Sequence, residues 1–195
     1  MAKKRSKADL SRFAVEVRKT DLGLSEYQRL CPYDLATEHG VDVYTLIDLA
    51  AAGCCEETIG FFTAQRPEAW SAALVPSGNG QFIVENAAHS PRRRRSNVAH
   101  EMAHLLLEHE FDRILFGDGN GRCRNSTSGE VEDEAAYFSG ELLLPAAAAR
   151  KAAVNKMSDG EVADLFDVSI EFARWRINVS GARTIAQRIA RKRTA

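Results

Sequence analysis

The segment NVAHEMAHLLLEHEF, residues 97–111, constrains this chain more than any other stretch. Its apolar residues recur at the period of an α-helix, which predicts that one face of the helix is buried. That face consists of Val98, Met102, Leu105 and Leu106. His100 and His104 are four residues apart, so on a helix their imidazoles point the same way, with Glu101 beside the first. A core helix that happens to contain histidines and a helix that supports a metal site both fit this pattern.

His100, Glu101 and His104 form the H-E-x-x-H pattern of zinc hydrolases. Histidines one helical turn apart can converge on a single ion, while the glutamate between them can take a proton from a water molecule. Short motifs also arise by chance, and an isolated H-E-x-x-H is compatible with a core helix. A third ligand decides between the two, because an open zinc site needs three protein ligands and one position for water.

The segment GEVEDEAAYFSGELLLP, residues 129–145, supplies that third ligand. Its predicted helix has a core stripe made of Val131, Ala135, Phe138 and Leu142. The adjacent stripe carries Glu132 with the small residues Ala136, Ser139 and Gly140. Small residues let two helices approach closely, which a short carboxylate side chain needs in order to reach a metal on the other helix. Glu132 is therefore predicted to complete a site for one Zn²⁺ per chain, and such a site also accepts Mn²⁺ in vitro.

The acidic run around Glu132 has a simpler explanation as well, since acidic residues favour the first turn of a helix. We adopt that explanation for Glu130, Asp133 and Glu134.

Three ligands and a glutamate predict peptide hydrolysis, with Glu101 as the general base. A β-hairpin is predicted at about residues 70–86, where two strand-like runs flank an Asn-Gly step. Its edge could receive an extended peptide by backbone pairing. Tyr137 and His109 are candidates for stabilising the oxyanion, although a structural role is the simpler interpretation of both.

The rest of the chain predicts an α+β fold. Helical periodicity covers about residues 8–19, 32–40 and 46–65, and the strand-like run VDVYTLI follows the second of these. Ser158 with Glu161, and Ser169, are predicted helix caps. A glycine-rich loop follows the histidine helix; it is not a calcium-binding EF-hand, because Arg122 and Cys123 occupy positions that need an oxygen ligand and a glycine.

The balance of charge excludes some classes of function. Twenty-six basic residues against twenty-seven acidic ones leave a formal net charge of −1, so no global field attracts nucleic acid or an anionic membrane. The longest apolar run, LLLPAAAA, is too short to span a bilayer, and no signal peptide is evident. The four cysteines form no C-x-x-C pair, which argues against a cysteine zinc site. A cytoplasmic protein is the simplest expectation.

Taken in order, the motifs resemble those of the ImmA/IrrE family of metallopeptidases. That family has an Asn-ending strand, an arginine-bearing segment leading to A-H-E-x-x-H, then E-x-x-A and an LL-x-P ending. Here these stand as IVEN, RRRRSNVAHEMAH, EDEA and ELLLP, within about residues 30–150. Two details depart from the family. Ser96 and Asn97 replace the phenylalanine and threonine that often precede AHE, and YFSG replaces the more usual FA segment.

The resemblance implies a zincin-like fold, so we expect an α+β metallopeptidase domain with a small antiparallel sheet. The family's zinc ligands fall on His100, His104 and Glu132 and its catalytic acid/base falls on Glu101, in agreement with the choice made from the residues. The resemblance also implies a cytoplasmic regulatory protease of bacteria, phages or mobile elements. Such proteins cleave an Xre-type helix-turn-helix repressor and so derepress stress-response or mobile-element genes.

The C-terminal segment EVADLFDVSIEFARWRINVSGA has the outline of a helix-turn-helix, with Arg174 and Arg176 on its second helix. Some members of the family carry such a motif. Asp167 stands where the turn often has glycine, and the segment lacks a broad basic face, so packing on the peptidase part or contact with a protein is preferred over DNA binding. We predict three parts in the chain: 1–65, the N-terminal helical part; 66–150, the catalytic core; and 151–195, a helix-turn-helix-like tail.

Two functions follow from these features. One is a zinc peptidase that acts on a repressor, and the other is a zinc-containing regulator that binds DNA or a protein with little or no proteolysis. Glu101 favours the first, since a structural zinc site needs no general base and is normally closed by four protein ligands.

Overall fold

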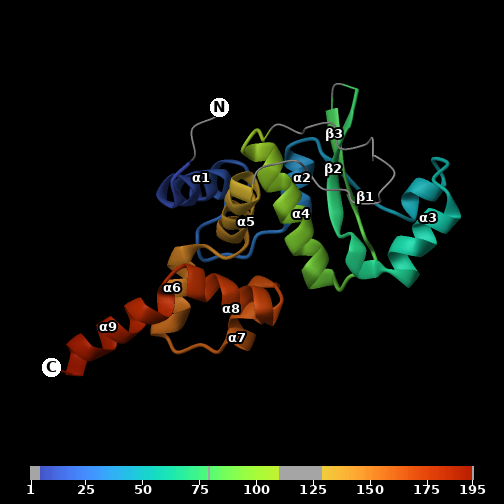
Figure 1. Ribbon diagram of the computed structural model, residues 1–195. Coiled ribbons are helices and arrows are strands. Elements are labelled where there is room, and N and C mark those ends of the chain that lie inside the picture. Colours follow the sequence, from blue (N-terminus) through green and yellow to red (C-terminus); the bar gives the residue numbers. More distant parts are fainter. Residues whose placement is uncertain (1–4, 79, 110–128, 195) are drawn as a thin grey trace.

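The computed structural model describes residues 5–78, 80–109 and 129–194, which form helices packed beside one small sheet (Figure 1). The α+β class is confirmed. Most of the glycine-rich loop, with Arg122 and Cys123, lies outside the described residues. The elements follow one another as α1 (Lys7–Thr20), α2 (Pro32–Glu38), β1 (Asp42–Thr45), η1 (Asp48–Ala50), α3 (Glu56–Gly60), η2 (Phe61–Gln65), η3 (Pro67–Ala69), β2 (Ala72–Ser77), β3 (Gly80–Glu85), α4 (Pro91–Leu106), α5 (Gly129–Leu143), α6 (Ala146–Val154), α7 (Asp159–Phe166), α8 (Ile170–Val179) and α9 (Ala182–Thr194).

The sheet has three strands in the order β1-β3-β2. β2 and β3 form the predicted antiparallel hairpin, with Ser77 opposite Gly80; Asn79 of its turn is outside the described residues. β1 pairs with β3 in parallel, with Asp42 opposite Phe82, so the sheet is mixed and not wholly antiparallel as expected. The helical connection that follows β1 leads to β2, which runs opposite to β1, and the hairpin then brings β3 back parallel to β1, between the two strands. β2 is left at an edge.

The region from 46 to 65 is less regular than its periodicity predicts. Three short helical pieces, η1, α3 and η2, replace one helix. Gly53 has a φ of 91°, a conformation that glycine adopts readily and that does not belong to a right-handed helix. Gly53 therefore interrupts the predicted helix completely.

α4 is the central helix of the fold. It contacts β2 and β3 on one side and α5 on the other, and α5 also packs on α1 (Figure 1). The helix begins at Pro91, ahead of the segment with helical periodicity, since proline suits the first turn of a helix. Two arginines fix this end: Arg94 pairs with buried Glu85, and Arg95 donates to the backbone oxygen of Leu30 at 2.6 Å.

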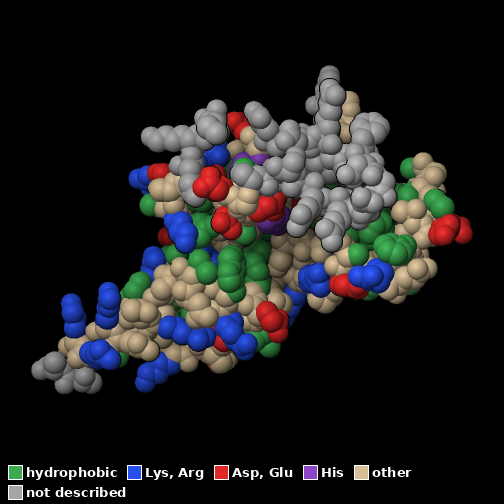
Figure 2. Space-filling model, viewed as in Figure 1, with side chains coloured by type: hydrophobic (Ala, Val, Ile, Leu, Met, Phe, Trp, Pro, Cys, Tyr) green, Lys and Arg blue, Asp and Glu red, His purple; other side chains and the backbone are tan. Residues whose placement is uncertain are grey.

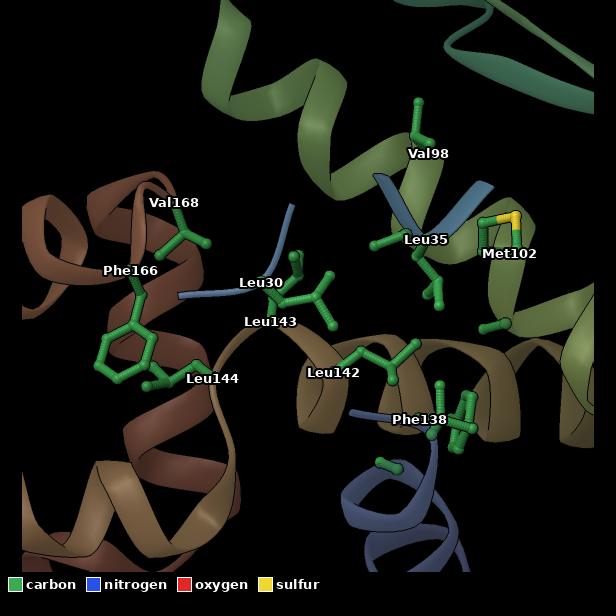
Figure 3. Close-up of a cluster of buried hydrophobic side chains, with 14 of the residues drawn as sticks. Leu30, Leu35, Val98, Met102, Phe138, Leu142, Leu143, Leu144, Phe166 and Val168 are labelled. Atoms are coloured by element: carbon green, nitrogen blue, oxygen red, sulfur yellow. The ribbon is translucent and has the colours of Figure 1, made fainter. Parts of the chain in front are cut away.

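The core runs without a break from α4 to the C-terminal helices. Figure 3 shows the leucine run 142–144 at its centre, with Leu142 near Phe138 and Leu144 near Phe166. All of these side chains are buried. The leucines that end α5 thus join the core of the histidine helix to that of α7 and α8.

The predicted apolar stripes of the two site helices are buried to different degrees. The fully buried members are Val98, Met102, Ala135, Phe138 and Leu142. The partly buried members are Leu105, Leu106 and Val131. The buried members on each helix face the shared core, which holds α4 and α5 in a fixed relation.

α7 and α8 have the outline of a helix-turn-helix and begin at the predicted caps. Ser158 forms a capping box with Glu161, and the Ser169 hydroxyl accepts a hydrogen bond from the backbone N–H of Phe172. Asp167 ends α7 in the left-handed conformation, with a φ of 54°. Aspartate is one of the few residues other than glycine that adopt this conformation readily, which explains how the turn forms without a glycine.

The two arginines considered for DNA contact differ in their surroundings. Arg174 is at the surface and its Nε lies 3.1 Å from Asp159. Arg176 is fully buried; its Nε donates to the backbone oxygen of Leu144 at 2.9 Å, and its guanidinium pairs with Glu141. Of the two side chains, Arg174 alone is therefore available to a partner, while Arg176 fastens α8 to α5.

Gly140 lies where α5 meets α8. A Cβ atom at this position would be 3.1 Å from the ring of Trp175. We expected the small residues of α5 to admit the histidine helix, but at Gly140 the close neighbour is α8.

Candidate metal centre

Three candidate ligand atoms converge between α4 and α5. The Nε2 atoms of His100 and His104 are 3.1 Å apart, and Oε2 of Glu132 is 3.2 Å from Nε2 of His100. Oε1 of Glu132 is 3.6 Å from Nε2 of His104. Helical spacing places both rings on one face of α4, and Glu132 reaches them from the first turn of α5. In the view of the molecule in Figure 2, histidine side chains lie beside acidic ones near the middle of the picture.

This donor set fits a zinc ion. Ligands about 2.0–2.2 Å from a tetrahedral zinc are roughly 3.3–3.6 Å from one another, close to the three separations found here. Two imidazoles and a carboxylate are also a known ligand set of open, catalytic zinc sites. The side chain of His104 is 3% exposed, whereas those of His100 and Glu132 are 28% and 41% exposed. The cluster is thus closed on the side of His104 and open toward solvent at its other two members.

Glu101 connects this cluster to the edge of the sheet. Its Oε2 accepts a hydrogen bond of 3.0 Å from the backbone N–H of Leu74, in β2. Alternate residues of an edge strand direct their N–H groups away from the sheet, and Leu74 is one of these. Glu101 therefore lies between the histidines and the side of β2 that pairs with no other strand among the described residues.

Burial disfavours the charged form of both kinds of side chain and so shifts their pKa values in opposite directions. It raises the pKa of Glu101, an effect opposed in part by His100 and by the hydrogen bond from Leu74. It also lowers the pKa of His104 to about 4, and the neighbouring His100 adds to this decrease. Because metals bind the neutral imidazole, His104 is in its ligating form at physiological pH. A carboxyl group with a raised pKa retains a proton more readily, which suits an acid/base catalyst.

The two candidates for stabilising an oxyanion have other contacts. The Tyr137 hydroxyl lies 3.2 Å from that of Ser11, in α1. His109 Nδ1 lies 3.0 Å from Nδ1 of His104, the ring nitrogen that does not take part in the cluster. Both contacts agree with the structural interpretation of these residues.

Sequence reasoning missed a buried polar network just before the histidine helix. Asn86 is fully buried, and its Nδ2 donates to three backbone oxygens within residues 62–70. The ring of His89 lies 2.9 Å from the backbone oxygen of Pro67 and 3.3 Å from Nδ2 of Asn97. Asn97, a departure from the family pattern, thus helps to attach this segment to α4. The asparagine that ends IVEN was the one sequence signal for the network.

The family comparison agrees with the geometry. Residues 60–178 match the family model described as the IrrE N-terminal-like domain, peptidase M78. This span is more than half of the chain and contains α4 and α5 with all four predicted site residues. The chain belongs to this family. It is an M78 metallopeptidase with a cluster of two histidines and a glutamate, as the resemblance implied.

The M78 match reaches further along the chain than the motifs alone indicated. It ends at residue 178, within α8, so the matched domain includes α6, α7 and most of α8. No curated protein matches the chain. Among the described residues, no helix of this M78 peptidase combines the length and apolar character needed to cross a membrane.

Proposed function

We propose that this M78 metallopeptidase is a zinc-dependent endopeptidase that cleaves an Xre-type helix-turn-helix repressor. The observation that carries the proposal is the position of Glu101, between the converging donor atoms and the outer edge of β2. Peptide hydrolysis at a metal needs a ligand set with an open position, a base and a place for the peptide. The chain provides a candidate for each.

The residues of the cluster have distinct chemical roles in this proposal. His100, His104 and Glu132 would hold the ion, which when bound lowers the pKa of water and polarises the scissile carbonyl. Glu101 would take the proton of the attacking water on a carboxylate oxygen and pass it to the leaving amine. Its raised pKa favours holding the proton between these two transfers.

β2 supports a peptide as the substrate. An extended peptide added beside β2 would run past Glu101, because the Leu74 N–H that binds this carboxylate faces the outer edge of the strand. Main-chain hydrogen bonds would supply affinity in this mode of binding. Pro76 has no N–H to donate, so donors for an added strand must come from the part of β2 before Pro76.

The choice of a repressor as substrate rests on the family resemblance. That resemblance implies a regulatory protease that acts inside the cell, and on the same ground we place the protein in the cytoplasm. Cleavage of the repressor would release stress-response or mobile-element genes.

A zinc-containing regulator that binds DNA or a protein without proteolysis is the alternative, and it has less support. A purely structural metal site has no use for a glutamate such as Glu101 at its edge. The C-terminal helices also offer little to DNA at the expected positions, because Arg176 is buried against Glu141.

A cleavage assay on purified full-length protein tests the proposal. Zinc-loaded wild type and the Glu101→Gln variant are each incubated with Xre-type repressors encoded beside the gene, and products are identified by mass spectrometry. We expect cleavage at a discrete bond by wild type, loss of cleavage with a chelator, and its return with zinc or manganese. Failure to cleave any of these repressors, by protein that holds one zinc per chain, contradicts the substrate assignment. Failure to bind zinc at all contradicts the metal centre.

A further inference from the structure

The ring of His104 is held from both of its nitrogen atoms. Nε2 faces His100 and Glu132, at 3.1 and 3.6 Å. Nδ1, on the other side of the ring, is 3.0 Å from Nδ1 of His109. The second contact is hydrogen-bond distance, and it requires a proton on one of the two Nδ1 atoms.

The end of α4 places His109 at this contact. The N–H of His109 donates to the backbone oxygen of His104 at 3.1 Å, and the N–H of Glu108 donates to Leu105 at 3.0 Å. Glu108 has a φ of 53°. These two bonds and the left-handed residue form a Schellman cap, which turns the chain back over the last turn of its own helix. His109 is thereby brought against His104 by backbone geometry, five residues further along the chain.

Glu134 lies on the other side of the His109 ring, and its burial shows that it is more than the first-turn acidic residue expected from the sequence. Its Oε2 is 3.7 Å from Nε2 of His109, an ion-pair separation that is longer than a hydrogen bond, and its Oε1 accepts a hydrogen bond of 2.9 Å from the backbone N–H of Arg5. The side chains of His109 and Glu134 are 6% and 11% exposed. A buried carboxylate so close to Nε2 favours the proton on that nitrogen, which leaves Nδ1 of His109 as an acceptor.

One arrangement of protons satisfies all of these contacts. With Nε2 of His109 protonated toward Glu134, Nδ1 of His109 accepts a hydrogen bond from Nδ1–H of His104. His104 then carries its lone pair on Nε2, where it faces His100 and Glu132. We propose that His109, backed by Glu134, is a positioning residue that fixes the ring orientation and tautomer of the ligand His104.

The inference rests on the metal centre of the proposed function but not on its substrate. An imidazole ligand usually donates its second N–H to a neighbouring acceptor, and loss of that acceptor weakens metal binding by about 10- to 100-fold. A positioning role also accounts for His109 better than a role at the oxyanion does, because both ring nitrogens of His109 face protein groups. Its contribution is therefore measurable in metal affinity, with no need for a known substrate.

Zinc affinity of the full-length protein, measured by competition with a chromophoric chelator at neutral pH, tests the proposal. His109→Leu keeps a similar volume but has no acceptor, whereas His109→Asn puts an amide oxygen near the position of Nδ1. Glu134→Gln removes the charge behind His109. His39→Asn is the matched control, since the ring of His39 also contacts a carboxylate, that of Asp21, but His39 does not belong to the metal cluster. Thermal unfolding of each metal-free variant shows whether it is folded.

We expect His109→Leu to weaken zinc binding by about 10- to 100-fold, His109→Asn to recover most of this loss, and His39→Asn to bind as wild type does. In zinc-loaded wild type, ¹H–¹⁵N correlation spectra should show a protected Nδ1–H on His104 that exchanges faster in His109→Leu. Wild-type affinity in His109→Leu overturns the proposal. Equal losses of zinc affinity in the leucine and asparagine variants, with an unprotected Nδ1–H in wild type, also overturn it. If neither His109 variant folds, the zinc affinity of Glu134→Gln decides in their place. Wild type that binds no zinc contradicts the metal centre itself.

Discussion

Arg176 of α8 and Glu141 of α5 form an ion pair inside the protein, with side chains 0% and 2% exposed. Both oxygens of Glu141 have further partners: the Ser11 hydroxyl donates to one at 2.7 Å, and the Ala146 N–H donates to the other at 2.8 Å. α5 also carries Glu132 in its first turn. The pair thus fixes the C-terminal helices to the helix that completes the metal centre.

Removing one partner of this pair should destabilise the fold strongly. Arg176→Leu leaves the buried carboxylate of Glu141 without its counter-charge, and such losses are about 3–5 kcal/mol in unfolding free energy. Urea denaturation measures the change. Arg174→Leu is the control, because its surface pair with Asp159 should contribute less than about 1 kcal/mol. If the two variants lose equal, small amounts of stability, the buried pair stabilises the fold no more than the surface pair does.

The same pair predicts how stability depends on pH. Burial by itself raises the pKa of Glu141, but Arg176, Ser11 and Ala146 together outweigh it and leave the pKa below that of an ordinary glutamate. A carboxyl whose pKa is lower in the folded state stabilises the fold fully above its unfolded pKa of about 4.3, and this contribution is lost as pH falls through the folded pKa. We expect the stability difference between wild type and Glu141→Gln to shrink below about pH 4. A difference that stays constant from neutral pH into acid would contradict this assignment, and denaturation curves at several pH values decide the matter.

Glu132 and its neighbour Asp133 offer a comparison within one helix. Glu132→Ala removes a ligand and should lose most of the bound zinc and the cleavage activity, whereas the exposed Asp133 can be changed to alanine with little effect on either. Elemental mass spectrometry of the purified proteins gives the zinc content per chain. Full occupancy in Glu132→Ala would remove Glu132 from the ligand set.

Glu101→Gln should separate metal binding from catalysis. The amide cannot take a proton from water, so we expect full zinc content with cleavage reduced at least about a hundredfold. The amide oxygen can still accept the hydrogen bond from Leu74, and thermal unfolding should therefore stay close to that of wild type. Undiminished cleavage by this variant, freed of wild-type contamination, rules out Glu101 as the base.

Local patterns in the sequence account for much of the fold. The apolar periods that predict α4 and α5 also place His100, His104 and Glu132 on facing sides, because a helix fixes the direction of each side chain. The caps at Ser158 and Ser169 were readable for the same reason: each depends on residues three positions apart. Features of this kind need no knowledge of distant contacts.

Features that depend on distant contacts could not be read in the same way. The parallel pairing of β1 depends on which strand lies beside it after a long connection. Arg176 resembles a surface arginine in sequence, and its burial is evident only once α8 packs on Gly140 and Glu141. His109 lies beyond the regular part of α4, where a left-handed Glu108 redirects the chain and periodicity no longer applies.

The outer edge of β2, which pairs with no strand in the described part of the chain, also bears on how the protein behaves when no substrate is present. An unpaired strand edge can form hydrogen bonds with a strand of another chain, and proteins often prevent this with a proline or a charged side chain at the edge. Here Pro76 offers no donor, and the Leu74 N–H is occupied by a carboxylate from the protein's own α4. In the absence of substrate, the residues of β2 that would bind a peptide therefore also hinder aggregation. A strand of another chain must displace Glu101 before it can pair at Leu74.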